Sequence, residues 1–158
     1  MGAEVAEIET LYRERYADFR NGLASVTRDH DLARDAVQHA FAEALATRRN
    51  FRGDGSLAAW VWKIGLRHAV RLRAGHQAVL NGRVDAGLPE PERDPALADA
   101  LRRLPPRRRL IVFLRYFGDL SYADIAEVLD VTEGTVAASL AQARDALRAT
   151  LTEGVIDG

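Results

Sequence analysis

Residues 120–143 read LSYADIAEVLDVTEGTVAASLAQA, and this stretch decides the fold of the C-terminal third of the chain. Ser121 followed by Asp124 is typical of a helix start, because both side chains can accept hydrogen bonds from free backbone N–H groups. Residues 130–132 form a short break, and Thr132 can cap the helix that follows. Each helix has one apolar stripe, made of Ile125, Ala126 and Leu129 before the break and of Val136, Leu140, Ala143 and Leu147 after it. This pattern predicts a helix-turn-helix.

The charge of this helix-turn-helix is unusual. No Lys or Arg occurs from Tyr116 to Ala143, where the charged residues are Asp119, Asp124, Glu127, Asp130 and Glu133. A helix-turn-helix normally reads the major groove of DNA, and basic side chains that neutralise phosphates supply much of its affinity. The sequence therefore predicts the shape of a DNA-reading module without its usual charge, and an ordinary helical hairpin is the alternative.

Basic residues gather elsewhere in the chain. Residues 48–73 hold seven Lys or Arg and one Asp, a net charge of +6, whereas residues 76–99 hold two bases and five acids, a net charge of −3. A basic patch of this kind indicates nucleic acid, although solvated helix faces also collect Arg.

The rest of the chain has helical periodicity and no alternating pattern, which predicts an all-α fold. Helices are expected at 31–47, 57–73 and 106–117, with a glycine-containing loop at 51–56. All five prolines fall between Pro89 and Pro106, so an extended, flexible linker with Pro, Gly and acidic residues is expected to join two small helical domains. The expected boundaries are a first domain at 1–74, the linker at 75–98, a helix-turn-helix domain at 99–152 and a tail at 153–158.

Several function classes are excluded by what the sequence lacks. The chain has no Cys, and its four His residues lack metal-ligand spacing. No phosphate-cradling glycine motif or nucleophile triad is present, so we expect no enzyme activity, no metal and no cofactor. Neither a signal peptide nor an apolar run of membrane-spanning length occurs, so a cytoplasmic protein without membrane insertion is expected.

Three stretches resemble a known family: DLARDAVQHAFAEAL (31–45), FRGDGSLAAWVWKIGLRHAV (51–70) and LRRLPPRRRLIVFLRYFGDLSYADIAEVLDVTEGTV (101–136). Their order and spacing are similar to those of the extracytoplasmic-function (ECF) sigma factors of bacterial RNA polymerase, in the sigma-70 family. The resemblance spans about residues 11–151. It implies a subunit that binds core RNA polymerase and directs promoter-specific initiation, with promoter DNA and an inhibitory anti-sigma factor as further candidate partners.

The resemblance also implies site residues in the first domain. The family's polymerase-docking positions match Asp35, Gln38 and Phe41, with His39 where the family usually has Glu. The stretch that melts and reads the −10 promoter element matches 51–71, where a flipped base would meet a glycine-flanked loop and a basic helix. The implied −10 residues are Arg52, Gly53, Asp54, Gly55, Ser56, Lys63, Arg67, His68 and Arg71. We also expect Trp60 to be buried and Trp62 to lie nearer the surface.

The helix-turn-helix matches the family's −35-reading domain, but three basic positions of the recognition helix are Ala137, Ser139 and Gln142 here, and only Arg144 remains. Hydrogen bonds and methyl contacts could still read bases, while basic residues of the preceding helix, Arg107, Arg108, Arg109 and Arg115, could hold phosphates. The implied −35 residues are Arg107, Arg115, Thr132, Thr135, Ala138, Ser139, Gln142 and Arg144.

Two alternatives remain open at this point. One is a sigma-fold regulatory or protein-interaction module whose C-terminal domain no longer reads DNA, because a neutral, Ala-rich helix also suits a protein partner. The other is a free-standing DNA-binding regulator, which would leave the basic first domain unexplained.

Overall fold

Amphipathic segments of this chain fold as helices, as their apolar spacing predicts. The computed structural model describes residues 2–79 and 95–156, and these two ranges contain helices and no strand, which confirms the expected all-α class. The elements are α1 (Val5–Thr27), α2 (His30–Ala46), η1 (Arg48–Asn50), α3 (Leu57–Val79), α4 (Pro95–Arg103), α5 (Pro106–Val112), η2 (Phe113–Phe117), α6 (Tyr122–Leu129) and α7 (Glu133–Ile156).

The helix-turn-helix forms through the predicted caps. Ser121 Oγ accepts a hydrogen bond from the backbone N–H of Asp124 at 3.0 Å, and Thr132 Oγ1 accepts one from the N–H of Thr135 at 3.1 Å. Between these two starts, α6 ends at Leu129, and the next residue, Asp130, has a φ of 55° in the left-handed region that stops a helix. The predicted break at 130–132 is therefore confirmed.

Two helix boundaries differ from the sequence expectation. Helix α3 continues past Arg73 to Val79, and α4 begins at Pro95, so both ends of the expected 75–98 linker are helical; its residues 80–94 lie outside the described residues. A glycine costs a helix only about 1 kcal/mol relative to alanine, so Gly75 does not end α3. Proline is tolerated in the first turn of a helix, which allows α4 to start at Pro95.

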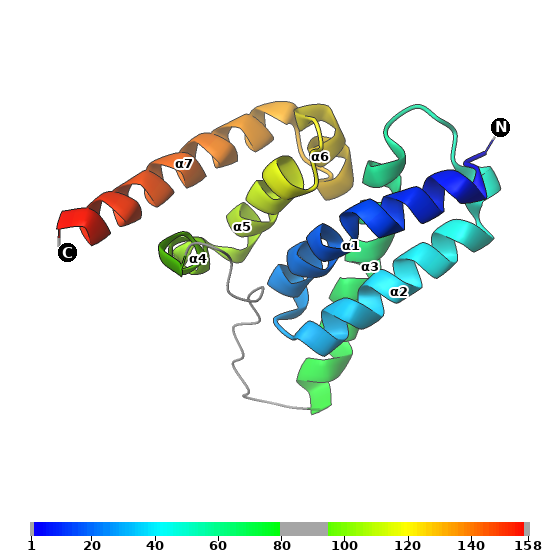
Figure 1. The fold of residues 1–158 in the computed structure, drawn as a ribbon, viewed down its shortest axis with the longest axis horizontal. Coiled ribbons are helices and arrows are strands. Elements are labelled where there is room, and N and C mark those ends of the chain that lie inside the picture. The colour runs from blue at the N-terminus through cyan, green and yellow to red at the C-terminus, as the bar shows by residue number, and fades with distance from the viewer. Residues whose placement is uncertain (1, 80–94, 157–158) are drawn as a thin grey trace.

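The helices form two lobes that pack against each other (Figure 1). In the first lobe α1, α2 and α3 contact one another, and in the second α4, α5 and α6 each contact α7. Between the lobes, α1 contacts α5 and η2, while α3 contacts α6. One cluster of buried apolar residues runs through both lobes. The acidic first helix of the helix-turn-helix therefore lies against the helix that carries the basic patch.

Polar contacts also join the lobes near the end of η2. The Arg15 guanidinium on α1 donates through Nη1 to the backbone carbonyl of Phe117 at 3.1 Å. Its Nη2 lies 3.7 Å from a carboxylate oxygen of Asp119. Since Arg15 and Asp119 are more than a hundred positions apart in the sequence, only the tertiary fold brings them together.

Candidate nucleic-acid interface and docking groove

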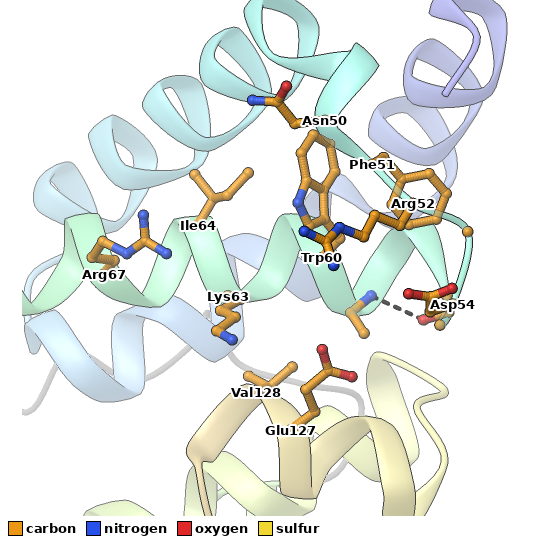
Figure 2. A pocket seen from close by; sticks show the side chains of 14 residues that line it. Asn50, Phe51, Arg52, Asp54, Trp60, Lys63, Ile64, Arg67, Glu127 and Val128 are labelled. Carbon is orange, nitrogen blue, oxygen red and sulfur yellow. Dashed lines mark hydrogen bonds between the residues drawn. The ribbon is translucent and has the colours of Figure 1, made fainter. Parts of the chain in front are cut away.

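A cavity of about 370 Å³ opens between the loop that follows η1, the first turns of α3, and α6 (Figure 2). It contains three cationic side chains, a half-buried indole and several backbone segments of a glycine loop. Its lining residues are Asn50, Phe51, Arg52, Gly53, Asp54, Gly55, Ser56, Ala59, Trp60, Lys63, Ile64, Arg67, Glu127 and Val128. A cationic cavity with an aromatic wall suits a nucleotide base and its phosphate.

The loop of this cavity is set by Gly53 and Ser56. Gly53 has a φ of +82° and nothing within 4 Å of where a Cβ would be, so it supplies a left-handed turn and an open approach. Ser56 Oγ accepts a hydrogen bond from the backbone N–H of Ala59 at 3.0 Å and caps α3. The loop thereby leaves its backbone exposed beside the cationic side chains.

Most of the residues predicted for the −10 element gather in this cavity: Arg52, Gly53, Asp54, Gly55, Ser56, Lys63 and Arg67. His68 and Arg71 do not line it. His68 faces α2, where its Nε2 lies 2.7 Å from a carboxylate oxygen of Glu43 and its ring stacks on His39 with centroids 5.1 Å apart. For His68, helical periodicity alone did not distinguish the two neighbouring faces of α3.

The expectation for the two tryptophans is wrong, because Trp62 is 1% exposed while Trp60 is half-buried at the cavity. The Trp62 ring stacks on Phe19 with centroids 4.2 Å apart. Two glycines make room for it: a Cβ on Gly22 would lie 2.5 Å from Trp62 Cη2, and one on Gly118 would lie 3.2 Å from its Nε1. The space for the Trp62 ring is left by Gly22 and Gly118, which are far from Trp62 in the sequence. The sequence pattern of α3 alone could therefore not reveal it.

Sequence reasoning did not assign the other seven cavity residues to the site: Asn50, Phe51, Ala59, Trp60, Ile64, Glu127 and Val128. Trp60 packs against Phe51 with centroids 5.5 Å apart, and it forms a wall of the cavity (Figure 2). Glu127 and Val128 enter from α6 on the other lobe, opposite Lys63 (Figure 2). The helical position of Trp60, near the loop and on the side of Lys63 and Ile64, was the only available signal in the sequence.

A second hollow, an apolar groove of about 800 Å³, runs between α1 and α2. Its walls are Ile8, Glu9, Tyr12, Arg13, Tyr16, Gln38, Phe41, Ala42 and Leu45. Gln38 donates from Nε2 to the Tyr12 hydroxyl at 2.9 Å, and Phe41 meets the Tyr12 ring edge-on with centroids 5.0 Å apart. Two of the three predicted polymerase-docking residues, Gln38 and Phe41, therefore share this groove.

The third predicted docking residue, Asp35, lies outside the groove walls on the exposed face of α2. Its carboxylate is 3.5 Å from His39 Nε2, one helical turn along. The position where the family usually has an acid thus holds a residue that pairs with Asp35. Phe41 is nearly all buried, so it shapes the groove and presents little surface of its own.

The recognition helix presents a neutral surface. Thr135, Ala138 and Gln142 are exposed on α7, and Ser139 is half-buried among them. The remaining predicted cation of this helix, Arg144, is exposed and donates from Nη2 to the Tyr122 hydroxyl at 3.2 Å. This face therefore offers hydroxyl, amide and methyl groups.

Of the basic residues expected beside this face, Arg107 is exposed on α5, and Arg115 donates to the backbone carbonyl of Leu120 at 3.1 Å. The expectation for Arg109 is wrong: it is buried and donates to the carbonyls of Leu101, Arg102 and Leu104 at 2.8–3.0 Å. Burial, with smaller contributions from neighbouring arginines, lowers the pKa of this guanidinium. Arg109 therefore caps the carbonyl groups at the C-terminal end of α4, and it is not available to DNA.

Among residues 2–79 and 95–156, no three His, Asp or Glu side chains are grouped so that they could hold a metal ion. No helix in those ranges is both long and apolar enough to cross a membrane.

Comparison with known proteins identifies the family. The sequence pattern described as "Sigma-70, region 4" matches residues 95–147, which include α4 to most of α7. The chain is 30% identical to the ECF RNA polymerase sigma-E factor of Escherichia coli K12 over 135 residues, which cover 72% of this chain and 70% of that protein. This chain belongs to the ECF sigma factors of the sigma-70 family. As a sigma factor it acts with core RNA polymerase at promoter DNA to direct transcription initiation.

Other relatives agree with this assignment. RNA polymerase sigma factor YlaC of Bacillus subtilis is 28% identical, with 92% of each chain covered. Two solved structures share the fold: the sigma factor RpoE of Bartonella quintana in complex with the anti-sigma factor NepR has a TM-score of 0.74 at 22% identity, covering 94% of this chain and 98% of that one. CnrH in complex with the cytosolic domain of CnrY has a TM-score of 0.65 at 21% identity, covering 96% and 91%.

Proposed function

We propose that this sigma factor divides its work between two units, residues 1–74 for polymerase docking and the −10 element, and residues 99–152 for the −35 element. The cavity on α3 carries this proposal, because it places a glycine loop, an indole and three cations around a space open to solvent. We assign to it a base of the melted −10 strand, with Trp60 beside the base and Lys63 and Arg67 near the backbone phosphates.

The polymerase contact is proposed for the α1–α2 groove. Its apolar wall and the Tyr12–Gln38 pair fit a protein helix laid along two helices. Asp35 would then lie at the rim of this contact. Because the core enzyme carries the chemistry of RNA synthesis, the sigma subunit contributes positioning and no catalysis of its own, and the site of action is the cytoplasm.

For the −35 element we propose readout through Thr135, Ala138, Ser139 and Gln142, with Thr132, Arg107, Arg115 and Arg144 toward the DNA backbone. Tethering to polymerase raises the effective concentration of this unit at the promoter, so few ionic contacts suffice. One observation favours a second candidate: the exposed recognition face has no cation before Arg144, and it therefore suits a protein partner such as an anti-sigma factor.

Mapping of transcription start sites after induced expression tests the proposal. Genes switched on by this chain should share two elements at −10 and −35, and purified protein with core polymerase should start transcription there. A shared −10 element without a −35 element would favour the second candidate. Absence of core binding would refute the function.

The cavity is tested with a short labelled non-template strand that carries the mapped −10 element. Lys63→Ala and Arg67→Ala should each flatten the salt dependence of strand binding by about 0.7 units of log–log slope, as expected for one lost phosphate contact. Arg34→Ala is a matched control: it also removes an exposed charge, but on α2, where Arg34 pairs with Asp31. Equal losses in all three variants would contradict the assignment of the cavity.

A further inference from the structure

The cavity on α3 that we assign to the −10 element (the −10 cavity) is partly closed by the second lobe. Glu127 and Val128 of α6 form one of its walls, and the other lining residues come from the first lobe. Figure 2 shows α6 on one side of the α3 residues, with Val128 next to Lys63 and the Glu127 carboxylate directed toward the loop. A nucleotide strand entering this cavity would meet the α6 side chains.

The two facing surfaces have opposite charge. The first lobe contributes Arg52, Lys63 and Arg67 to the cavity against one carboxylate, Asp54. From α6, the Asp124 and Glu127 carboxylates approach the loop: a Cβ on Gly55 would lie 3.6 Å from Asp124 Oδ1 and 3.7 Å from Glu127 Oε2. Two carboxylates of α6 thus lie beside the glycine loop, at one side of the cationic cavity.

We propose that α6 is an internal latch, in which Asp124 and Glu127 compete with the −10 strand for the cationic cavity until the lobes separate. The latch rests on the proposed function of the cavity. It also gives a role to the acidic composition of the helix-turn-helix: a basic α6 would be repelled by the first lobe, whereas an acidic one is attracted to it.

The contacts that hold the latch allow it to open. Glu127 is exposed and Asp124 is half-buried, so salt and water screen their attraction to the cations. Away from the cavity, the lobes share the apolar cluster, and they are also joined by the contacts of Arg15 with Phe117 and Asp119 and by the packing of Gly118 on Trp62. Opening must therefore also expose apolar surface. A ligand that binds only the open form shifts the population toward the open form. The apparent affinity of this ligand is its affinity for the open form multiplied by the fraction of molecules that are open.

A disulfide tether tests closure directly, because the chain has no cysteine of its own. Gly55→Cys combined with Asp124→Cys places two thiols across the contact, where a Cβ on Gly55 would lie 3.6 Å from the present Asp124 carboxylate oxygen. The full-length double variant should cross-link on mild oxidation, bind the −10 strand at least about tenfold more weakly when oxidised, and recover on reduction. Gly55→Cys alone should not respond to oxidation.

Opening variants test the opposite direction. Glu127→Lys should bind the −10 strand about three- to tenfold more tightly than the parent, since it replaces attraction by repulsion. Arg15→Ala should also tighten binding, although it changes no residue of the cavity. Asp145→Lys adds the same charge at an exposed site on α7 and should have no effect beyond general attraction to DNA.

The outcomes separate the two proposals. Failure of the tether to form, equal strand binding by oxidised and reduced protein, or equal gains in Glu127→Lys and Asp145→Lys would overturn the latch. If the tether forms but the reduced protein with core polymerase does not bind the −10 strand, the assignment of the cavity is what fails, and the latch as a control of promoter binding falls with it.

Discussion

Gly22→Ala is the sharpest test of the packing behind the cavity on α3. Gly22 lies in the last third of α1, and a methyl group there would sit 2.5 Å from Cη2 and 2.9 Å from Cζ3 of Trp62. Trp62 cannot retreat easily, because its ring is buried and stacked on Phe19. The added methyl must therefore move α1 away from α3.

The expected magnitude is a balance of two effects. Overpacking a rigid core typically costs about 1–3 kcal/mol, whereas replacing a glycine inside a helix by alanine gains about 1 kcal/mol. Because the Trp62 ring is buried and stacked on Phe19, the cost should fall in the upper part of its range. We expect a net loss of about 1–2 kcal/mol, which lowers Tm by about 2–8 °C in a chain of this length.

Urea unfolding followed by circular dichroism measures the change. Gly75→Ala is the matched control, since Gly75 also lies within a helix, α3, but nothing is within 4 Å of its added Cβ. This variant should be more stable than the parent by up to about 1 kcal/mol. If Gly22→Ala and Gly75→Ala shift the free energy of unfolding in the same direction, the account of the space for the Trp62 ring is refuted.

Three further predictions concern the second lobe. Arg109→Leu should lower the free energy of unfolding by about 2–4 kcal/mol, because three carbonyls lose a buried charged donor, whereas Arg107→Leu at an exposed site should change it by less than about 0.5 kcal/mol; thermal unfolding compares the two. Ser139→Arg with Gln142→Arg should steepen the salt dependence of promoter binding by about two units of log–log slope if the recognition helix lies on DNA, as measured by fluorescence anisotropy. Thr132→Ala should cost about 1 kcal/mol through loss of the helix cap, measured by urea unfolding.

Each of these predictions has an outcome that contradicts it. Equal destabilisation by the two arginine variants would show that the carbonyl contacts of Arg109 contribute little. An unchanged salt slope in the double arginine variant would indicate that the recognition face binds a protein, and Ala149→Arg, exposed farther along α7, controls for general charge. Full stability of Thr132→Ala would show that the cap does not determine the start of α7.

Local signals in the sequence predicted much of this fold. The cap at Ser121, the break at 130–132 and the cap at Thr132 follow from side chains that bond to their own backbone within three residues. Interactions over such short separations are encoded where they act, so they can be read without a structure. The same holds for the helix class, which follows from apolar periodicity.

Part of the candidate site was also predicted, because some of its residues are close together in the sequence. The glycine loop and Lys63 and Arg67 are close in sequence, and they were found together. His68 was expected beside the other −10 residues, but it has two possible neighbours, α2 and the cavity, and the packing of the helices places it against Glu43 of α2. Arg109 looked like its exposed neighbour Arg107, although three carbonyls around the end of α4 bury it.

The sequence by itself determined the helices, the helix-turn-helix and the separation of charge into a basic 48–73 segment and an acidic, cation-free 116–143 segment. Only the tertiary structure decided that these two segments meet. Contacts such as that of Gly118 with Trp62, or of Glu127 with the cavity on α3, join residues more than fifty positions apart. Their geometry depends on how whole helices pack, and helical periodicity specifies which face is apolar but not which partner covers it.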